Sequence, residues 1–134
     1  MRSLLDVKNP MQFDPVLFEQ MKERAMRVLM ESKTETASQV IVLFTEKENE
    51  YFYLISNAIS ADASEEEVLL GRLREAEDTD IFRMLCVWQD RSVDLPSLRF
   101  RKTCCQINPA NKDAGIFVAT RDGHSVMRLG NTLP

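Results

Sequence analysis

The sequence predicts one α+β domain in which a mainly antiparallel β-sheet packs with two or three helices. Its 134 residues are 44% hydrophobic, which suits a single compact domain with its own core. Apolar residues recur with helical spacing in some segments and gather into short β-branched runs in others. No repeat, low-complexity tract or linker interrupts this order, so we treat residues 1–134 as one domain.

Two helices have clear starting signals. Asp14-Pro15 reads as an N-cap followed by proline at the first helical position, and predicts a helix from about Asp14 to Ser32. Ser64-Glu65-Glu66-Glu67 fits a capping box and predicts a second helix that ends near Glu77. The inward residues expected of this second helix are Leu69, Leu70, Leu73 and Ala76.

The strands are predicted from β-branched and aromatic runs. Gln39–Thr45 and Tyr51–Asn57 form the first expected hairpin. Ile81–Gln89 is apolar on nearly every residue, as in a central strand covered on both faces. The sequence therefore places Ile81–Gln89 in the middle of the sheet.

The C-terminal third is harder to interpret. Asp94–Ile107 fits either a strand or a helix, and Pro96 with few β-branched residues favours a helix. Residues 108–113 are expected to form a plain loop. Residues 115–120 and 124–129 flank Asp122-Gly123, which predicts a hairpin in which Arg121 pairs with His124. The face expected to be buried carries Ile116, Val118, Met127 and Leu129.

Several classes of site lack the residues they need. The only histidine is His124, and Cys104-Cys105 are adjacent rather than spaced as a zinc half-site, so we expect no metal. The four glycines allow neither a phosphate-binding loop nor a nucleophile elbow. Asp78-Thr79-Asp80 begins like a calcium loop, but Arg83 stands where the required glycine would be. We therefore expect no cofactor.

The chain shows no sign of a membrane or secretory destination. No stretch approaches the roughly 20 apolar residues of a membrane span. Asp6 and Lys8 interrupt any signal-peptide core. Three cysteines, an odd number, favour reduced thiols. These observations predict a cytoplasmic protein that does not contact membranes.

Charge is distributed unevenly along the chain. Residues 91–134 hold 7 of the 17 basic and 3 of the 21 acidic residues, so this part carries +4 and residues 1–90 carry −8. The net charge of −4 argues against nucleic acid as a partner. Arg91, Arg99, Arg101 and Lys102 form a candidate anion-binding cluster. The alternative is a solvated face that pairs with acidic helices of the same molecule.

A thiol enzyme would need a cysteine, a base and an orienting acid. The available residues are one of Cys86, Cys104 or Cys105 with His124 and Asp122. Arg101 and Lys102 would lower the pKa of a neighbouring thiol. The competing interpretation is that the cysteines are buried and that His124 is a surface turn residue.

The first helix carries a second apolar patch on its far side. Val16, Met26 and Met30 form this patch, which we interpret as a candidate interface because methionine adapts to irregular surfaces. The alternative is that the N-terminal residues fold back over it; the residues concerned are Leu4, Leu5, Val7, Met11 and Phe13.

With no catalytic motif, the sequence favours a small non-enzymatic module for protein–protein interaction or regulation. We expect it to have a protein partner or to self-associate, as a homodimer joined through a sheet edge or through the Met26 and Met30 face. The first alternative is an anionic-ligand or nucleic-acid binding module that uses residues 91–102. The second is a cysteine-dependent enzyme.

Overall fold

The computed structural model describes residues 12–32, 37–56 and 63–134. In these residues a six-stranded mixed sheet packs with three α-helices and two 3-10 helices, which confirms the predicted α+β class. None of the helices in the described ranges is long and apolar enough to span a bilayer. The elements in chain order are α2 (Pro15–Glu31), β1 (Gln39–Thr45), β2 (Glu50–Ile55), α3 (Ala63–Glu75), β3 (Ile81–Trp88), β4 (Val93–Asp94), α4 (Leu98–Ile107), η1 (Pro109–Asp113), β5 (Gly115–Thr120), β6 (Gly123–Arg128) and η2 (Leu129–Thr132).

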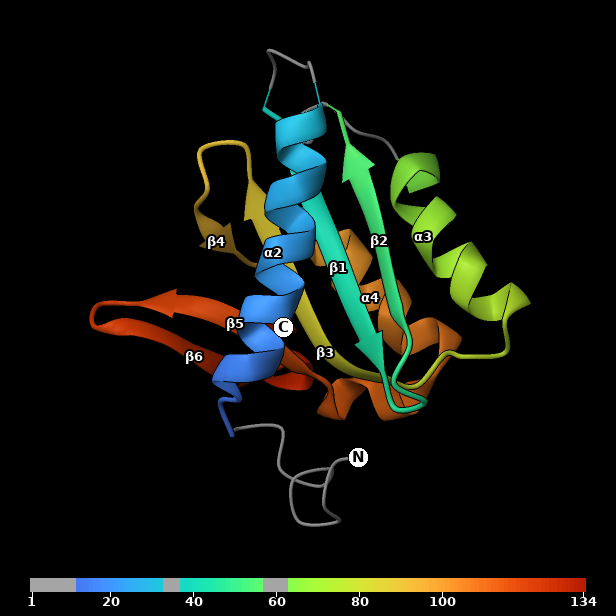
Figure 1. Ribbon diagram of the computed structural model, residues 1–134. Helices are drawn as coiled ribbons and strands as arrows, with labels where there is room; N and C mark the ends of the chain where they lie inside the picture. Colours follow the sequence, from blue (N-terminus) through green and yellow to red (C-terminus); the bar gives the residue numbers. More distant parts are fainter. Residues whose placement is uncertain (1–11, 33–36, 57–62) are drawn as a thin grey trace.

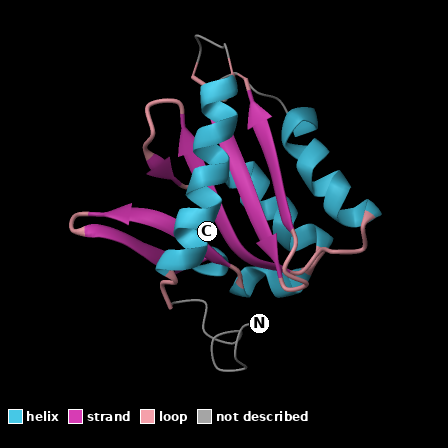
Figure 2. Cartoon of the chain, in the orientation of Figure 1, coloured by secondary structure: helices cyan, strands magenta, loops and turns pink. Residues whose placement is uncertain are grey.

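The strands follow the spatial order β2-β1-β3-β5-β6, and the short β4 also pairs with β3. All pairings are antiparallel except β3 with β5, which is parallel over Arg83↔Gly115 and Met84↔Ile116. β3 is buried along nearly its whole length and lies in the middle of the order, as predicted. Figure 2 shows the β5–β6 hairpin projecting from one side of the sheet.

Helices cover both faces of the sheet. In Figure 1, α2 crosses the front of the sheet, whereas α4 lies behind it and α3 flanks β2. Alternate residues of β1 point to opposite faces, so Val40 and Val42 pack under α2 while Ile41 and Leu43 pack against α3 and α4. Each face therefore has its own apolar cluster, and both clusters depend on the same central strands.

Two helices begin at side-chain caps, of which the sequence predicted the first. The Asp14 carboxylate accepts hydrogen bonds from the backbone N–H groups of Val16 at 3.0 Å and Leu17 at 3.1 Å, which confirms the first predicted helix. Ser97 Oγ accepts from the N–H of Phe100 at 3.0 Å and caps α4. The ambiguous segment 94–107 is therefore largely helical.

Three local predictions were wrong. α3 begins at Ala63, so the predicted cap position, residue 64, lies inside the helix rather than before it. Ala76, expected to face inward, is exposed because the helix has already ended at Glu75. Residues 109–113 form the helix η1 rather than a plain loop, because Asn108 caps it by accepting from the N–H of Ala110 at 3.0 Å.

The C-terminal hairpin is shifted from its predicted register. Thr120 pairs with Gly123 and Ala119 with His124, so the loop is Arg121-Asp122. Gly123 has φ +146°, a conformation that glycine adopts readily, and this lets it begin β6 instead of closing the turn. Both faces of the hairpin contribute to the core, since Ile116 and Phe117 are buried on opposite sides. Met127, expected on the buried face, is exposed.

Candidate functional site

A carboxylate is held between the N-terminal ends of α3 and α4. Glu66 lies in the first turn of α3, and its Oε1 accepts from Arg99 Nε at 2.7 Å and lies 2.5 Å from Arg99 Nη2. Its other oxygen accepts a hydrogen bond from the Ser97 hydroxyl. Two helix starts that are 31 residues apart in the sequence are joined at this carboxylate.

Burial makes these contacts necessary. The Glu66 side chain is 6% exposed, whereas Arg99 is half exposed. A buried carboxylate without partners would cost several kcal/mol, so Arg99 and Ser97 supply the opposite charge and the donor that this position needs. The arrangement fixes α3 against α4 through a structural ion pair.

From the sequence, Glu66 was expected only as part of the capping box at residues 64–67, and no role was predicted for Ser97. A signal was present, because Glu66 precedes Leu70 by four residues and Leu73 by seven. That spacing places Glu66 on the apolar face of the helix, where both leucines are buried. A carboxylate on a buried face indicates a partner elsewhere in the chain.

A cavity of about 540 Å³ opens where β3 ends. Its walls are formed by Ala37, Trp88, Gln89, Asp90, Ser92 and Asp94. Binding sites for small molecules commonly enclose about 300–1,000 Å³. Asp94 lies three residues before Ser97, so the loop that follows β4 connects the cavity to the Glu66 ion pair.

The turn between β3 and β4 gives the cavity a fixed wall. The Trp88 backbone N–H donates to Ser92 O at 2.9 Å, and the Arg91 N–H donates to Trp88 O at 2.8 Å. Asp90 Oδ1 accepts from Ser92 Oγ at 2.6 Å and from Ser92 N at 2.9 Å. These hydrogen bonds, with the Ser92 hydroxyl contributing most, lower the pKa of Asp90 below the ordinary value of an aspartate.

The cysteines do not form a catalytic group. Cys86 and Cys104 belong to the apolar cluster under α3 and α4, whereas His124 contacts the Phe18 ring at 4.5 Å on the α2 face. Burial raises the pKa of both thiols. All three cysteines are free, and no three His, Cys, Asp or Glu residues in the described segments are grouped so as to hold a metal ion.

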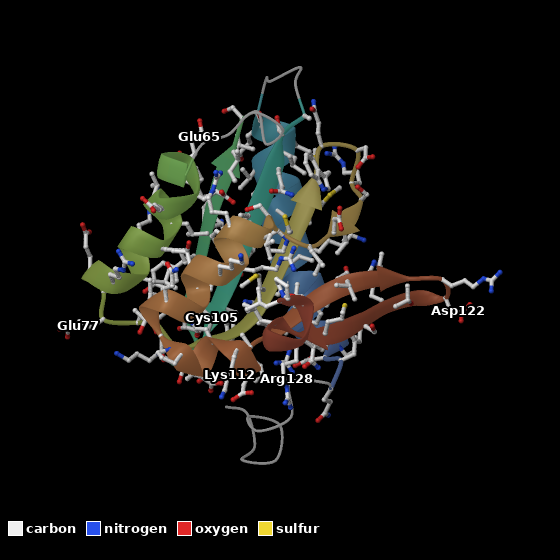
Figure 3. All side chains as sticks on the ribbon, turned by 180° about the vertical axis from the view of Figure 1, so that it is seen from behind. Glu65, Glu77, Cys105, Lys112, Asp122 and Arg128 are labelled. Carbon is white, nitrogen blue, oxygen red and sulfur yellow. The ribbon has the colours of Figure 1, made fainter. Side chains whose placement is uncertain are left out.

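Cys105 also differs from the sequence-based expectation. Burial raises the pKa of its thiol, and the opposing effect comes from Lys112 rather than from Arg101 or Lys102. Figure 3 shows Cys105 on α4 and Lys112 on η1 at the same end of the molecule. The thiol is therefore less ionised at neutral pH than a free cysteine.

The four basic residues of the predicted anion site have different contacts. Arg99 pairs with Glu66, and Arg101 donates to Pro96 O and Thr132 O, each at 2.9 Å. Arg91 donates to Gln89 O at 3.3 Å in the β3–β4 turn. Lys102 and Arg99 line a cavity on the outer face of α4. An anion site made from all four residues stays a prediction.

The predicted interface residues lie on α2. Val16 is 77% and Met30 is 73% exposed, whereas Met26 is half-buried. Phe13 packs on Phe18 and Phe117 with ring centroids 5.4 and 5.5 Å away, so it joins the core side of the helix. The other residues expected to cover the patch lie outside the described residues, and the interface stays a prediction.

Comparison with known proteins gives a structural likeness but no sequence match. No family model and no curated protein matches the chain. Cytidine deaminase from Mycobacterium leprae is similar with TM-score 0.63 and 13% identity, over 87% of this chain and 97% of the other. The cytidine deaminases of Mycobacterium tuberculosis and Burkholderia pseudomallei each give TM-score 0.62 and 13% identity over 87% of this chain, and over 94% and 95% of their own.

This likeness corrects the function expected from the sequence. A non-enzymatic, self-associating module for interaction or regulation was predicted, with an anion-binding module and a cysteine-dependent enzyme as alternatives. The prediction of a non-enzymatic module was wrong, because it rested on the absence of recognised motifs, whereas the chain shares its architecture with enzymes over most of both lengths. Self-association, like the anion site, stays a prediction. The protein therefore has the fold of the cytidine deaminases.

Proposed function

We propose that this protein binds a nucleoside, or the base of one, without the zinc-dependent chemistry of the deaminases whose fold it shares. The observation that carries the proposal is the likeness to cytidine deaminases over 87% of this chain and up to 97% of the other. Because a fold alone does not determine function, the proposal also depends on a site. A cavity of suitable size lies beside the start of α4.

Zinc does not fit the residues at the helix starts. Zinc deaminases carry His or Cys two residues before a glutamate, and Pro-Cys-x-x-Cys in a second segment. Ser64-Glu65-Glu66 and Pro96–Phe100 have the glutamate, the proline and the spacing of that pattern. Serine stands at 64 and 97, and the buried Phe100 stands at the last ligand position. None of the three supplies the thiolate or imidazole that zinc prefers.

The glutamate of that pattern has a different environment in this protein. In zinc deaminases it moves protons to and from the substrate. Here the Glu66 carboxylate is buried and engaged by Arg99 and Ser97. A general base needs its oxygen within reach of the substrate proton, and Glu66 is instead part of a contact between two helices. We therefore assign Glu66 a structural role.

The test is calorimetric titration of the protein with cytidine, uridine and adenosine, with D-ribose as the control for binding through sugar alone. We expect one saturable site for at least one nucleoside and none for ribose. Protein from zinc-supplemented medium should contain far less than one zinc per chain and release no ammonia from cytidine. Absence of binding by all three nucleosides would overturn the proposal. Stoichiometric zinc with ammonia release would overturn its zinc-free part.

A further inference from the structure

We infer that the outer edge of β6 is an interaction surface, and that its partner is the β6 strand of a second copy of this chain. The two β6 strands would pair antiparallel about a two-fold axis and join both sheets into one. This inference goes beyond the proposed function and does not depend on it. It rests on the open edge, on the charges at the two ends of the hairpin and on one exposed methionine.

The backbone of β6 has an unpaired side. β6 is the last strand in the spatial order, and in the described residues it pairs only with β5. The Leu129 N–H, directly after β6, donates to Ala114 O at 2.8 Å, so the odd-numbered residues turn their backbone groups toward β5. The N–H and C=O groups of His124, Val126 and Arg128 consequently point away from β5. Such a row of donors and acceptors is a template for another strand.

The opposite edge of the sheet is protected, whereas the edge at β6 is not. At the opposite edge, α3 flanks β2, and Arg72 Nη1 donates to Phe52 O at 3.0 Å (Figure 1). Lysine and proline commonly discourage pairing at an edge strand, and neither occurs in β6. Figure 1 also shows the β5–β6 hairpin projecting away from the other strands. The β6 edge is therefore the one suited to strand pairing.

The two ends of the hairpin carry opposite charges. Asp122 is exposed at the tip, and Arg128 lies at the base, as Figure 3 shows. Arg128 Nη1 is 3.9 Å from Asp113, and a guanidinium has five donors, so this ion pair leaves donors for a second carboxylate. In an antiparallel pair, the tip of one copy lies beside the base of the other. Asp122 of each copy then meets Arg128 of the partner subunit.

These charges select one register. A two-fold axis normal to the sheet must pass through a residue position, because directly opposed residues share a face. With Ser125 on the axis, Asp122 opposes Arg128 of the partner subunit. With Val126 on the axis, Arg128 would oppose His124 of the partner subunit. With His124 on the axis, Asp122 would oppose the apolar Val126. Of these three registers, the one centred on Ser125 matches opposite charges.

The same register gives an exposed apolar side chain a contact. Met127 is 37% exposed, and in this register it is directly opposed to Gly123 of the partner subunit. No atom of the described residues lies within 4 Å of the position that a Cβ on Gly123 would take. The thioether of Met127 therefore has room to pack over the Gly123 backbone, away from water. Symmetry provides each contact twice per dimer.

Sedimentation equilibrium tests the association. A contact along one strand is smaller than a standard interface, so we expect a reversible dimer with a dissociation constant between about 1 μM and 100 μM. Asp122→Arg brings two arginines together at each end of the interface and should weaken the dimer at least about tenfold. The matched control, Asp80→Arg, makes the same change of charge at an exposed residue outside the hairpin and should change the dissociation constant by less than about twofold. A protein that stays monomeric up to about 1 mM would overturn the inference.

Ser125→Cys tests the register. Ser125 turns its backbone groups toward β5, so the two copies of residue 125 would form a non-hydrogen-bonded pair with Cα atoms about 4.5 Å apart, which a disulfide can span. In a Cys105→Ser background, mild oxidation should link Ser125→Cys into a dimer, and peptide mapping should find the disulfide between two copies of position 125. Thr120→Cys, exposed on β5, is the matched control and should stay unlinked.

The outcomes are distinguishable. If Asp122→Arg and Asp80→Arg affect the dimer equally and Ser125→Cys gives no link, another surface joins the copies and the assignment of β6 is overturned. A Ser125→Cys link without any effect of Asp122→Arg would overturn the ion pairs. Neither measurement involves a nucleoside, so failure of the proposed function would leave this inference standing. A monomeric protein would in turn leave the proposed function standing.

Discussion

Arg99 neutralises a buried carboxylate, so its removal should be costly even though Arg99 is itself half exposed. Arg99→Ala leaves Glu66 without its cation and should lower the free energy of unfolding by about 2 kcal/mol. Lys102→Ala on the exposed surface of the same helix should cost less than about 0.5 kcal/mol. Urea denaturation followed by circular dichroism measures both. Equal stability of Arg99→Ala and the wild-type protein would show that the ion pair contributes nothing.

The thiols should react according to burial. Because the thiolate is the reactive form, the raised pKa of Cys105 lowers its thiolate fraction at every pH below that pKa. We expect Cys105 to alkylate more slowly than a free thiol at pH 7.5 and faster as the pH rises. Cys86 and Cys104 should react only when the protein unfolds. Time-resolved iodoacetamide labelling with mass spectrometry measures each site, and rapid labelling of Cys104 in the folded protein would contradict this prediction.

At the scale of elements, Asp78 joins the end of α3 to the β1–β2 turn. Its Oδ2 accepts from Thr45 Oγ1 at 2.9 Å, Asn49 Nδ2 at 3.0 Å and the Tyr51 hydroxyl at 3.0 Å. Burial is the largest effect that raises the pKa of Tyr51, and the hydrogen bond to Asp78 adds to it. In the sequence, Asp78 stands out only because Asp78-Thr79-Asp80 begins like a calcium loop.

Removing this carboxylate leaves three donors without their common acceptor. Asp78→Ala should therefore lower the free energy of unfolding by about 2–4 kcal/mol. Asp80→Ala, two residues away on the surface, is the matched control and should change it by less than about 0.5 kcal/mol. Chemical denaturation of both variants provides the comparison. A loss for Asp78→Ala no greater than that of the control would show that the hydrogen bonds are energetically unimportant.

Elements set by local chemistry were predictable from the sequence. Asp14-Pro15 marked the start of α2, and the apolar run Ile81–Gln89 gave the central strand. The parallel pairing of β3 with β5 was not predictable, because it joins residues separated by two helices. The register of β5–β6 was missed because Gly123 occupies a strand position that only its φ of +146° reveals.

The candidate site was less predictable than the fold for the same reason. Glu66 and Ser97 meet only in the folded chain, and Trp88 gains its cavity from the turn that follows it. The spacing of Glu66 with its buried leucines indicated an inward carboxylate, yet it could not identify the partner.

At the scale of the whole molecule, folding brings the acidic and basic parts of the sequence together. Arg99, from the basic segment 91–134, pairs with Glu66 from the acidic segment 1–90. Arg101 is used within its own segment, on the carbonyl groups of Pro96 and Thr132. Part of the positive charge of residues 91–134 is therefore paired with negative charge of residues 1–90 inside the molecule. This agrees with the alternative that the basic residues form a solvated face paired with acidic helices of the same molecule.

Because the two apolar clusters hold the helices on the sheet, we expect the melting temperature of the protein not to depend on a metal ion. The clusters cover both faces of the sheet, and the ends of α3 and α4 are joined by Glu66, Ser97 and Arg99 rather than by zinc ligands. Chelation with EDTA should therefore leave the melting temperature unchanged within about 1 °C.

Added zinc should also leave the melting temperature unchanged. A metal bound at 100 times its dissociation constant would stabilise the fold by about 2.7 kcal/mol, which for a domain of this size shifts the melting temperature by several degrees. Differential scanning fluorimetry with EDTA, with zinc and with magnesium as the control cation tests this directly. A melting temperature that falls with the chelator and recovers with zinc alone would mean that the fold depends on a zinc site that the described residues do not provide. An unchanged value would be consistent with the two apolar layers and the helix-joining ion pair being sufficient to hold the deaminase fold together.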